Sequence, residues 1–224
     1  MAIKLEVAQA DLAFEAGFPK PEFRLFRDVA VLLDHLYRRL ESYGLRLTDI
    51  RVERGSGTVN DHHIVLYLFN YWMTVRVRTE RVEVGCSTLP RDYLDKYKAA
   101  IIDVLRAVKD YRSDLSFPAF AVVVGLHGSL EGRRVEDYLA QYVVNGPKNL
   151  GPTTGNGVVF YYGAEGDRFL STLTVDRSAT VPDALFVRVH GVWDAGRVAP
   201  EALAGMAEVF VRQALENLGL EVPR

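Results

Sequence analysis

The chain has 224 residues, which is enough for one large domain or two small domains with a substantial buried core. Apolar residues make up 49% of the sequence and charged residues 25%, a balance typical of globular proteins that excludes a disordered chain. The 27 basic and 29 acidic residues are interspersed and leave a net charge of −2, so the basic stripe of a nucleic-acid-binding protein is excluded.

Cysteine content and the beginning of the sequence favour the cytoplasm. A single cysteine, Cys86, excludes an intramolecular disulfide framework and fits a reducing compartment. The first residues, MAIKLEVAQADLAF, lack the positively charged region and the apolar block of a signal peptide. We therefore expect a cytoplasmic protein that contacts neither a membrane nor nucleic acid.

The chain opens with a strand predicted at about 3–8, followed by a helix predicted over 22–43. The helix prediction rests on apolar residues that recur at helical spacing and therefore share one stripe. Gly44 supplies the end of the helix, because glycine readily adopts the left-handed conformation found there. The stripe contains Leu25, Val29, Leu32, Leu33, Leu36, Leu40 and Tyr43.

The most apolar stretch, HHIVLYLFNYWMTV at 62–75, is predicted to be β-structure. It is too short for a membrane-spanning helix, which needs about 20 apolar residues, and it is interrupted by Asn70. Its β-branched and aromatic side chains favour a strand over a helix. The stretch is either one long bent strand or, if the chain turns near Asn70–Tyr71, a hairpin of strands at 63–70 and 72–79.

The two faces of this stretch lead to different expectations. In an extended chain alternate residues share a face. The residues expected beneath the helices are Val65, Tyr67, Phe69, Met73 and Val75. The opposite face is expected to meet the other half of the sheet or a neighbouring subunit, and its predicted interface residues are Leu66, Leu68 and Trp72.

The remaining elements continue the same alternation of strands and helices. Further strands are predicted at about 45–53, 81–86, 119–128, 157–162, 168–176 and 184–193. Helices are predicted at 91–111 and 200–218, with a shorter helix near 133–143. Pro200 suits the first turn of the last helix, where its missing amide hydrogen costs nothing.

A block of strands followed by a helix occurs twice, which predicts an α+β fold. We expect an antiparallel sheet covered on one face by long amphipathic helices. No flexible linker divides the chain, so 1–224 is predicted to be a single compact domain. An internal duplication into units of about 1–115 and 116–224 would explain the repeated order and the similar strand ends VVVGLHG and LFVRVHG. Chance similarity over seven residues is the other explanation.

Two features outside the regular elements are candidate sites. His127 and His190 each precede a glycine at a strand end, and they would share a metal or phosphate only if the two strands were neighbours. No further ligand is fixed by spacing, and such glycines commonly mark strand ends. The segment NGPKNLGPTTGNG at 145–157 is predicted to be a lid, a binding loop or a disordered segment, and its candidate site residues are Lys148, Asn149 and Thr153.

No constellation of nucleophile, base and metal ligands stands out in the sequence, so we expect no catalytic residue, no metal and no cofactor. The leading interpretation is therefore a non-enzymatic binding or assembly protein that acts through protein–protein contacts. Its two apolar faces at 62–75 need two covers, which favours self-association into a homo-oligomer beside contacts with an unidentified protein partner.

The alternative interpretation is a protein, or an enzyme, that binds a small apolar ligand. Its cavity would lie between a curved sheet and a long helix, with 145–157 as the lid. The candidate ligand-binding residues are Phe69, Tyr71, Met73, Tyr161, Phe169 and His190.

Overall fold

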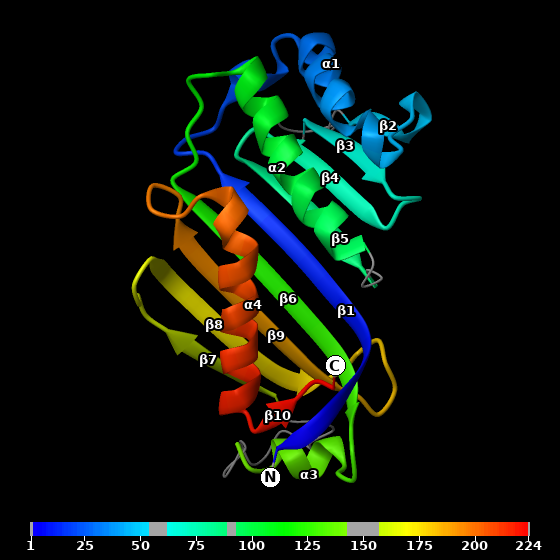
Figure 1. Ribbon diagram of the computed structural model, residues 1–224, viewed down its shortest axis with the longest axis vertical. Coiled ribbons are helices and arrows are strands. Elements are labelled where there is room, and N and C mark those ends of the chain that lie inside the picture. The colour runs from blue at the N-terminus through cyan, green and yellow to red at the C-terminus, as the bar shows by residue number, and fades with distance from the viewer. Residues whose placement is uncertain (1, 54–61, 89–92, 143–156, 224) are drawn as a thin grey trace, which may run out of the picture.

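The structure, a computed structural model, describes residues 2–53, 62–88, 93–142 and 157–223. Within them one ten-stranded sheet has the order β2-β3-β4-β5-β1-β6-β9-β8-β7, with β10 beside β1 (Figure 1). All neighbours on this path are antiparallel, so the α+β class with a large antiparallel sheet is confirmed. The strands are β1 (Ile3–Gly17), β2 (Ile50–Glu53), β3 (His63–Leu68), β4 (Met73–Arg78), β5 (Arg81–Ser87), β6 (Ala119–Leu130), β7 (Val158–Tyr162), β8 (Arg168–Arg177), β9 (Leu185–Asp194) and β10 (Leu220–Glu221).

Four α-helices accompany the sheet in the described residues: α1 (Val29–Leu40), α2 (Leu94–Tyr111), α3 (Val135–Leu139) and α4 (Pro200–Asn217). Short 3₁₀ turns occur at Phe23–Phe26, Glu41–Tyr43 and Leu47–Asp49. Figure 1 shows α2 and α4 in front of the sheet at an angle to each other, whereas α3 lies at the lower end. No helix in the described part of the chain is long and apolar enough to cross a membrane.

The helix predicted over 22–43 is broken near its start. Asp28 has a non-helical backbone (φ −132°, ψ 80°), and its side chain accepts a hydrogen bond from the Val31 amide. This cap satisfies an amide that has no partner within the helix, so α1 begins at Val29 rather than at residue 22. At the other end Gly44 adopts the left-handed conformation (φ 81°), as the sequence predicts.

The stretch 62–75 is a hairpin, and its turn corrects the predicted division of faces. Positive φ angles at Phe69, Asn70 and Tyr71 reverse the chain between β3 and β4. The register places Leu68 opposite Met73, so even-numbered residues of β3 share a face with odd-numbered residues of β4. Residues of β3 and β4 that were predicted to lie on opposite faces are therefore together in the core, all fully buried: Leu66, Leu68, Met73 and Val75.

β1 is much longer than the strand predicted at 3–8, because it runs between two partners. Its second half pairs with β5 on one side and with β6 on the other. Phe14 and Ala16 are buried on the helix side, while Asp11 and Glu15 alternate with them on the other face. Alanine and glutamate have low strand propensity, which hid this alternation in the sequence.

The buried core is divided into two clusters, one under each half of the helical layer. The first joins β3, β4 and β5 to α1, α2 and the first half of α4, and the second joins β8 and β9 to α3 and the second half of α4. On the central strand β6, Val122 packs against the first cluster and Val124 against the second, and both are only partly buried. The helix-side face of the sheet is therefore incompletely covered at its centre.

Candidate functional site

An apolar groove of about 900 Å³ lies between α2 and α4. Its floor is formed by the two central strands, which are contributed by β1 and β6. The floor residues are Leu12, Phe14, Val122, Val124 and Leu126. Because α2 and α4 diverge (Figure 1), this part of the sheet is only partly covered: Phe14 and Leu126 are buried, whereas Leu12, Val122 and Val124 are partly exposed.

The groove walls are apolar side chains of the two helices. α2 contributes its first two turns, and α4 contributes one side along most of its length, because residues three or four apart share a helix face. At the open end of the groove, β10 and the residue after it, Val222, also line it. The apolar wall residues are Leu94, Tyr97, Ile101, Ile102, Leu203, Ala204, Ala207, Val211 and Leu215.

The rim of the groove carries more acidic than basic side chains. The basic side chains are Lys98 and Arg212, and four glutamates accompany them: Glu201, Glu208, Glu216 and Glu221. The Lys98 ammonium lies 2.6 Å from the Glu208 carboxylate and so links α2 to α4 across the groove. This charge distribution favours a ligand whose apolar surface is flanked by positive charge.

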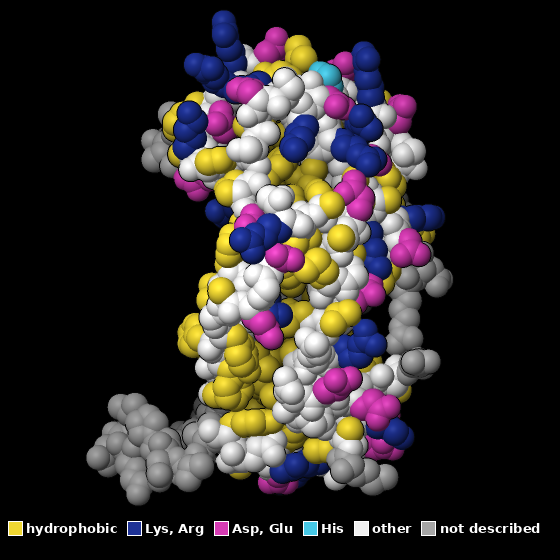
Figure 2. All heavy atoms as spheres, turned by 60° about the vertical axis from the view of Figure 1, so that its left-hand side comes forward, with side chains coloured by type: hydrophobic (Ala, Val, Ile, Leu, Met, Phe, Trp, Pro, Cys, Tyr) yellow, Lys and Arg dark blue, Asp and Glu magenta, His cyan; other side chains and the backbone are white. Residues whose placement is uncertain are grey.

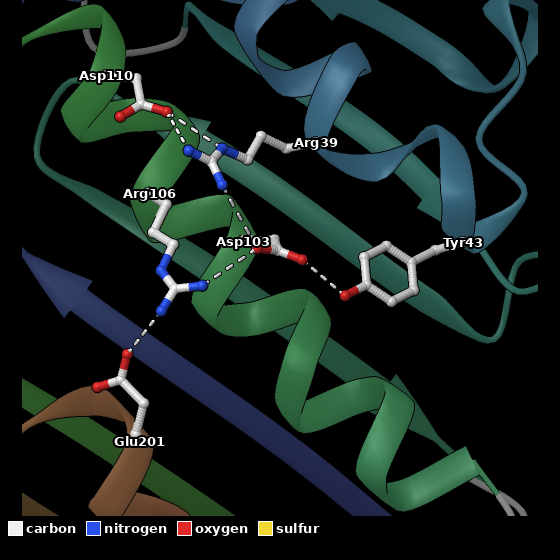
Figure 3. A network of polar contacts seen from close by, with 6 residues as sticks. All are labelled: Arg39, Tyr43, Asp103, Arg106, Asp110 and Glu201. Atoms are coloured by element: carbon white, nitrogen blue, oxygen red, sulfur yellow. Dashed lines mark hydrogen bonds and ion pairs between the residues drawn. The ribbon is translucent and has the colours of Figure 1, made fainter.

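A network of polar contacts fixes the closed end of the groove by joining three helices (Figure 3). Arg106 on α2 pairs with Glu201 on α4 at 3.2 Å, and it lies 3.8 Å from Asp103. Asp103 accepts a hydrogen bond from the Tyr43 hydroxyl at 2.7 Å, and Arg39 on α1 pairs with Asp110 at 2.7 Å. Burial and the Asp103 carboxylate raise the pKa of Tyr43 to about 12.

The opposite face of the sheet has a smaller hollow of about 480 Å³ over the central strands. Gly85 and Gly125 form part of its floor, and Arg76 and Arg188 line it. Beside it lies His127, buried and stacked on Phe186 with 4.6 Å between ring centroids. The His127 ring also contacts the Ser178 hydroxyl at 2.8 Å and the Asp11 carboxylate at 3.3 Å, so this histidine is held on both nitrogens.

His127 and His190 do lie on neighbouring strands but are not opposite each other. In the β6–β9 register His127 pairs with Phe186, and His190 pairs with Val123. Val123 lies roughly 13 Å along β6 from His127, which is too far for two ligands of one ion. Burial, followed by Arg188, lowers the pKa of His190, while Glu15 opposes this shift. No group of three His, Cys, Asp or Glu side chains with metal-binding geometry occurs among the described residues.

The six residues predicted to line a ligand cavity are not brought together. Met73 is in the core, and Phe69 packs edge-on against Tyr43 and Tyr93. Tyr71 lines the smaller hollow, and the other three residues lie elsewhere on the sheet: His190 on β9, and the exposed Tyr161 and Phe169 on β7 and β8. None of the six lines the groove between α2 and α4. The predicted loop residues Lys148, Asn149 and Thr153 lie outside the described residues.

Of the three predicted interface residues only Trp72 is accessible to a second molecule. Its side chain is 44% exposed in the β3–β4 turn, where it meets the edge of the Tyr93 ring. Leu66 and Leu68 belong to the first core cluster beneath the helices. A subunit contact through all three residues is therefore not available in this fold.

Cys86 is buried on the helix-side face of β5. Burial, with a smaller contribution from Asp11, raises the pKa of its thiol to about 11. The thiol is therefore protonated at neutral pH and lacks the thiolate that a cysteine nucleophile requires.

A second exposed apolar surface lies at the outer edge of the sheet, on β7 and the beginning of β8. Figure 2 brings this edge of the sheet forward and shows hydrophobic side chains among charged ones along it. Tyr161 is the most exposed large hydrophobic side chain described, at 76%. The exposed apolar residues of this hairpin are Val159, Tyr161, Tyr162, Phe169 and Leu170.

Sequence reasoning missed the groove residues as a site. Ile101 and Val211 belong to apolar helix stripes, and Val122 and Val124 belong to a strand predicted from VVVGLHG. An apolar stripe looks the same in sequence whether it is covered or open, because only the angle between α2 and α4 decides which part stays exposed. The chain matches no family model and no curated protein sequence. The geometry of the groove therefore carries the functional argument.

Proposed function

We propose that this chain is a non-enzymatic binding protein that takes the apolar face of an amphipathic helix from a partner protein. The observation that carries the proposal is the apolar floor at Leu12, Val122 and Val124, which the two flanking helices leave only partly covered. Helix-in-groove recognition uses such a surface, because apolar residues at helical spacing fill it from one side. The incoming helix would lie at the open end of the groove, beside Val211 and Leu215 and beyond the Lys98–Glu208 ion pair that joins α2 to α4.

The rim supports a partner helix with basic residues at its flanks. Glu216 and Glu221 line the open end of the groove, where α2 has diverged from α4. Lys98 and Arg106 already pair with Glu208 and Glu201 on α4. Complementary charge at a rim mainly raises the association rate and selects the partner, whereas the apolar floor supplies most of the affinity.

The alternative occupant is a small apolar ligand, which the same groove would take. Its volume falls within the range of about 300–1,000 Å³ typical of small-molecule sites. Such sites usually bury most of the ligand surface, however, and the strand floor here faces outward between the helices. A protein segment is therefore the better match, and a small ligand remains a distinct outcome of the test.

We also propose that the groove arose by internal duplication of a strand-block-plus-helix unit. The sheet order supports this, because β5, β4, β3 and β2 follow outward from β1, just as β9, β8 and β7 follow outward from β6. In each unit an α-helix follows the meander, α2 in the first and α4 in the second. These would be the equivalent amphipathic helices covering one sheet face, and the groove would be the space at the junction. We further propose that the protein is cytoplasmic and that it associates with itself.

The proposal is tested with a fluorescein-labelled amphipathic peptide of about 15 residues, long enough for helix formation in water. One version carries Lys at both flanks, and a second carries Glu at the same positions. Fluorescence anisotropy should show tighter binding of the Lys-flanked version. Its affinity should fall by at least about tenfold in a Val211→Asp variant, because a carboxylate in the groove wall must be desolvated by the bound helix.

The matched control is Val209→Asp, which places the same charge on the same helix but outside the groove, at a side chain that is 45% exposed. This variant should bind the peptide as the wild type does. Val211 packs against the second core cluster, so Val211→Asp should melt at a lower temperature, and thermal melting must show that both variants are folded at the assay temperature. Equal affinities for the two variants would contradict the proposal. A wild-type protein that binds the fluorescent apolar probe 1-anilinonaphthalene-8-sulfonate but neither peptide would favour the small-ligand alternative.

A further inference from the structure

The outer strand β7, which has no further strand beside it among the described residues, has an uncharged, strongly β-forming sequence. It is the last strand of the described sheet, and its residues Val158–Tyr162 read VVFYY. Sheet edges in stable monomers are usually protected by charged residues, proline, bulges or a covering element, because their unpaired amides and carbonyls pair readily with another strand. Val159, Tyr161 and Tyr162 are instead exposed on this strand.

The other end of the sheet is built differently. The edge strand β2 is short and carries Arg51 and Glu53 beside its exposed Val52. Arg51 covers the Tyr67 ring at 5.3 Å, and Glu53 pairs with His63 at 3.0 Å. Charged side chains that are held along the edge discourage pairing with a second strand. The two edge strands of the sheet thus differ in charged side chains, which are present on β2 and absent from β7 and which discourage the addition of a further strand.

We propose that β7 is the self-association surface of this protein and pairs antiparallel with β7 of a second copy around a two-fold axis at Phe160. A two-fold contact requires the surface to complement itself. In this register Val159 faces Tyr161 of the second copy and Val158 faces its Tyr162. Each pair occurs twice and joins a β-branched residue to an aromatic ring, a favourable cross-strand combination. No like charges meet, because the strand has none.

The exposed residues at the beginning of β8 extend the contact beyond the strand itself. Leu170 lies on the same sheet face as Tyr161. Tyr161 pairs with Thr172, and Leu170 is two residues from Thr172 along β8, so all three side chains point to one face. Phe169 stands next to Leu170 at a register shift in β8. An interface of this kind is at the lower end of stable contacts, about 1,000 Å² in total, so the dimer should dissociate on dilution. The inference deepens the self-associating part of the proposed function without using the groove.

Sedimentation analysis of the full chain at up to about 100 µM tests the proposal, because interfaces of this size associate in that range. The wild type should form a dimer. Tyr161→Lys, at a side chain that is 76% exposed and so tolerates substitution, should weaken it by at least about tenfold. The matched control Val52→Lys, on the opposite edge, should dimerise as the wild type does. Both variants should still bind the Lys-flanked peptide, which separates this proposal from that for the groove.

The register is tested by oxidative cross-linking in two single-cysteine additions. Phe160→Cys should form an intermolecular disulfide, because the two-fold axis sets residue 160 opposite itself. Val159→Cys should not, since it faces residue 161 of the second copy. The native Cys86 gives little background because it is buried and its pKa is raised. A wild-type monomer, a dimer lost in Val52→Lys but kept in Tyr161→Lys, or cross-linking at 159 instead of 160 would overturn the proposal.

Discussion

Asp103 shows how one side chain can hold several elements in place. It accepts a hydrogen bond from the Tyr43 hydroxyl at 2.7 Å and lies between Arg39 and Arg106 (Figure 3). It therefore connects α1 and the 3₁₀ turn that follows it to α2. Through Arg106 the same network reaches Glu201 at the beginning of α4. Exposed ion pairs contribute little to stability individually, about 0–1 kcal/mol. Their main effect here is to hold α2 and α4, the helices that flank the groove, at a fixed angle to each other.

Tyr43 gives this network a pH dependence that can be measured. Its folded-state pKa of about 12 exceeds the ordinary tyrosine value of 10.0, because burial disfavours the phenolate and Asp103 binds the neutral phenol. An acid whose pKa is raised on folding stabilises the protein at pH values below its unfolded pKa, and this contribution is lost as pH rises through the folded pKa. We therefore expect a Tyr43-dependent loss of stability between about pH 10 and 12.

Thermal melting of the wild type and of Tyr43→Phe across pH 8–11.5 measures this effect. At pH 8 the variant should be less stable by about 1–2 kcal/mol, because it lacks the hydrogen bond to the Asp103 carboxylate. At alkaline pH the difference should shrink, since only the wild type loses the contribution of residue 43. The pKa values of Tyr97 and Cys86 are also raised, so the comparison uses the difference between the two proteins. A constant difference across this pH range would show that Tyr43 has no role in the alkaline response.

At the scale of elements, the β3–β4 hairpin separates what sequence can predict from what it cannot. Local patterns identified both strands and placed a turn near Asn70–Tyr71 as one alternative, and positive φ angles occur there. The predicted faces were wrong because they were assigned as if 62–75 were one continuous strand. The turn shifts the alternation by one residue, so the residues of β4 point to the face opposite to the predicted one relative to β3. The angle between α2 and α4 is not a local property at all. This is why the helices were predictable and the groove between them was not.

The corrected faces predict a large loss of stability for one substitution in this hairpin and a small loss for another. Leu66→Ala should lower the free energy of unfolding by about 2–5 kcal/mol, because Leu66 is fully buried between the sheet and the helices and its truncation leaves a cavity. Trp72→Ala should cost much less, since Trp72 is 44% exposed in the turn and mainly contacts Tyr93. Urea unfolding of both variants provides the measurement. A larger loss for Trp72→Ala than for Leu66→Ala would mean that the hairpin faces are assigned incorrectly.

At the scale of the whole molecule, the two proposed contact surfaces are separate. The groove lies over β1 and β6, and β7 is separated from β6 by β9 and β8. A dimer formed through β7 therefore extends the sheet from one edge and leaves the groove of each copy open. In the proposed arrangement each copy offers its own groove, so one dimer presents two identical binding sites and gains avidity for a partner that carries two helices.

The central claim is that a helix binds on the helix-side face of the sheet, between α2 and α4. Val123 and Val124 test it directly, because they are adjacent and partly exposed but point to opposite faces: Val124 lines the groove, and Val123 lines the hollow on the other face. The measurement is the rate at which N-ethylmaleimide alkylates Val124→Cys and Val123→Cys, with and without saturating Lys-flanked peptide. The buried Cys86 reacts little because its pKa is raised to about 11.

The peptide should slow alkylation of Val124→Cys by at least about tenfold at saturation and should leave the alkylation rate of Val123→Cys unchanged. Protection of Val123→Cys instead would place the binding site on the other face of the sheet. A peptide that binds without changing the rate at Val124→Cys would contradict the groove as its site.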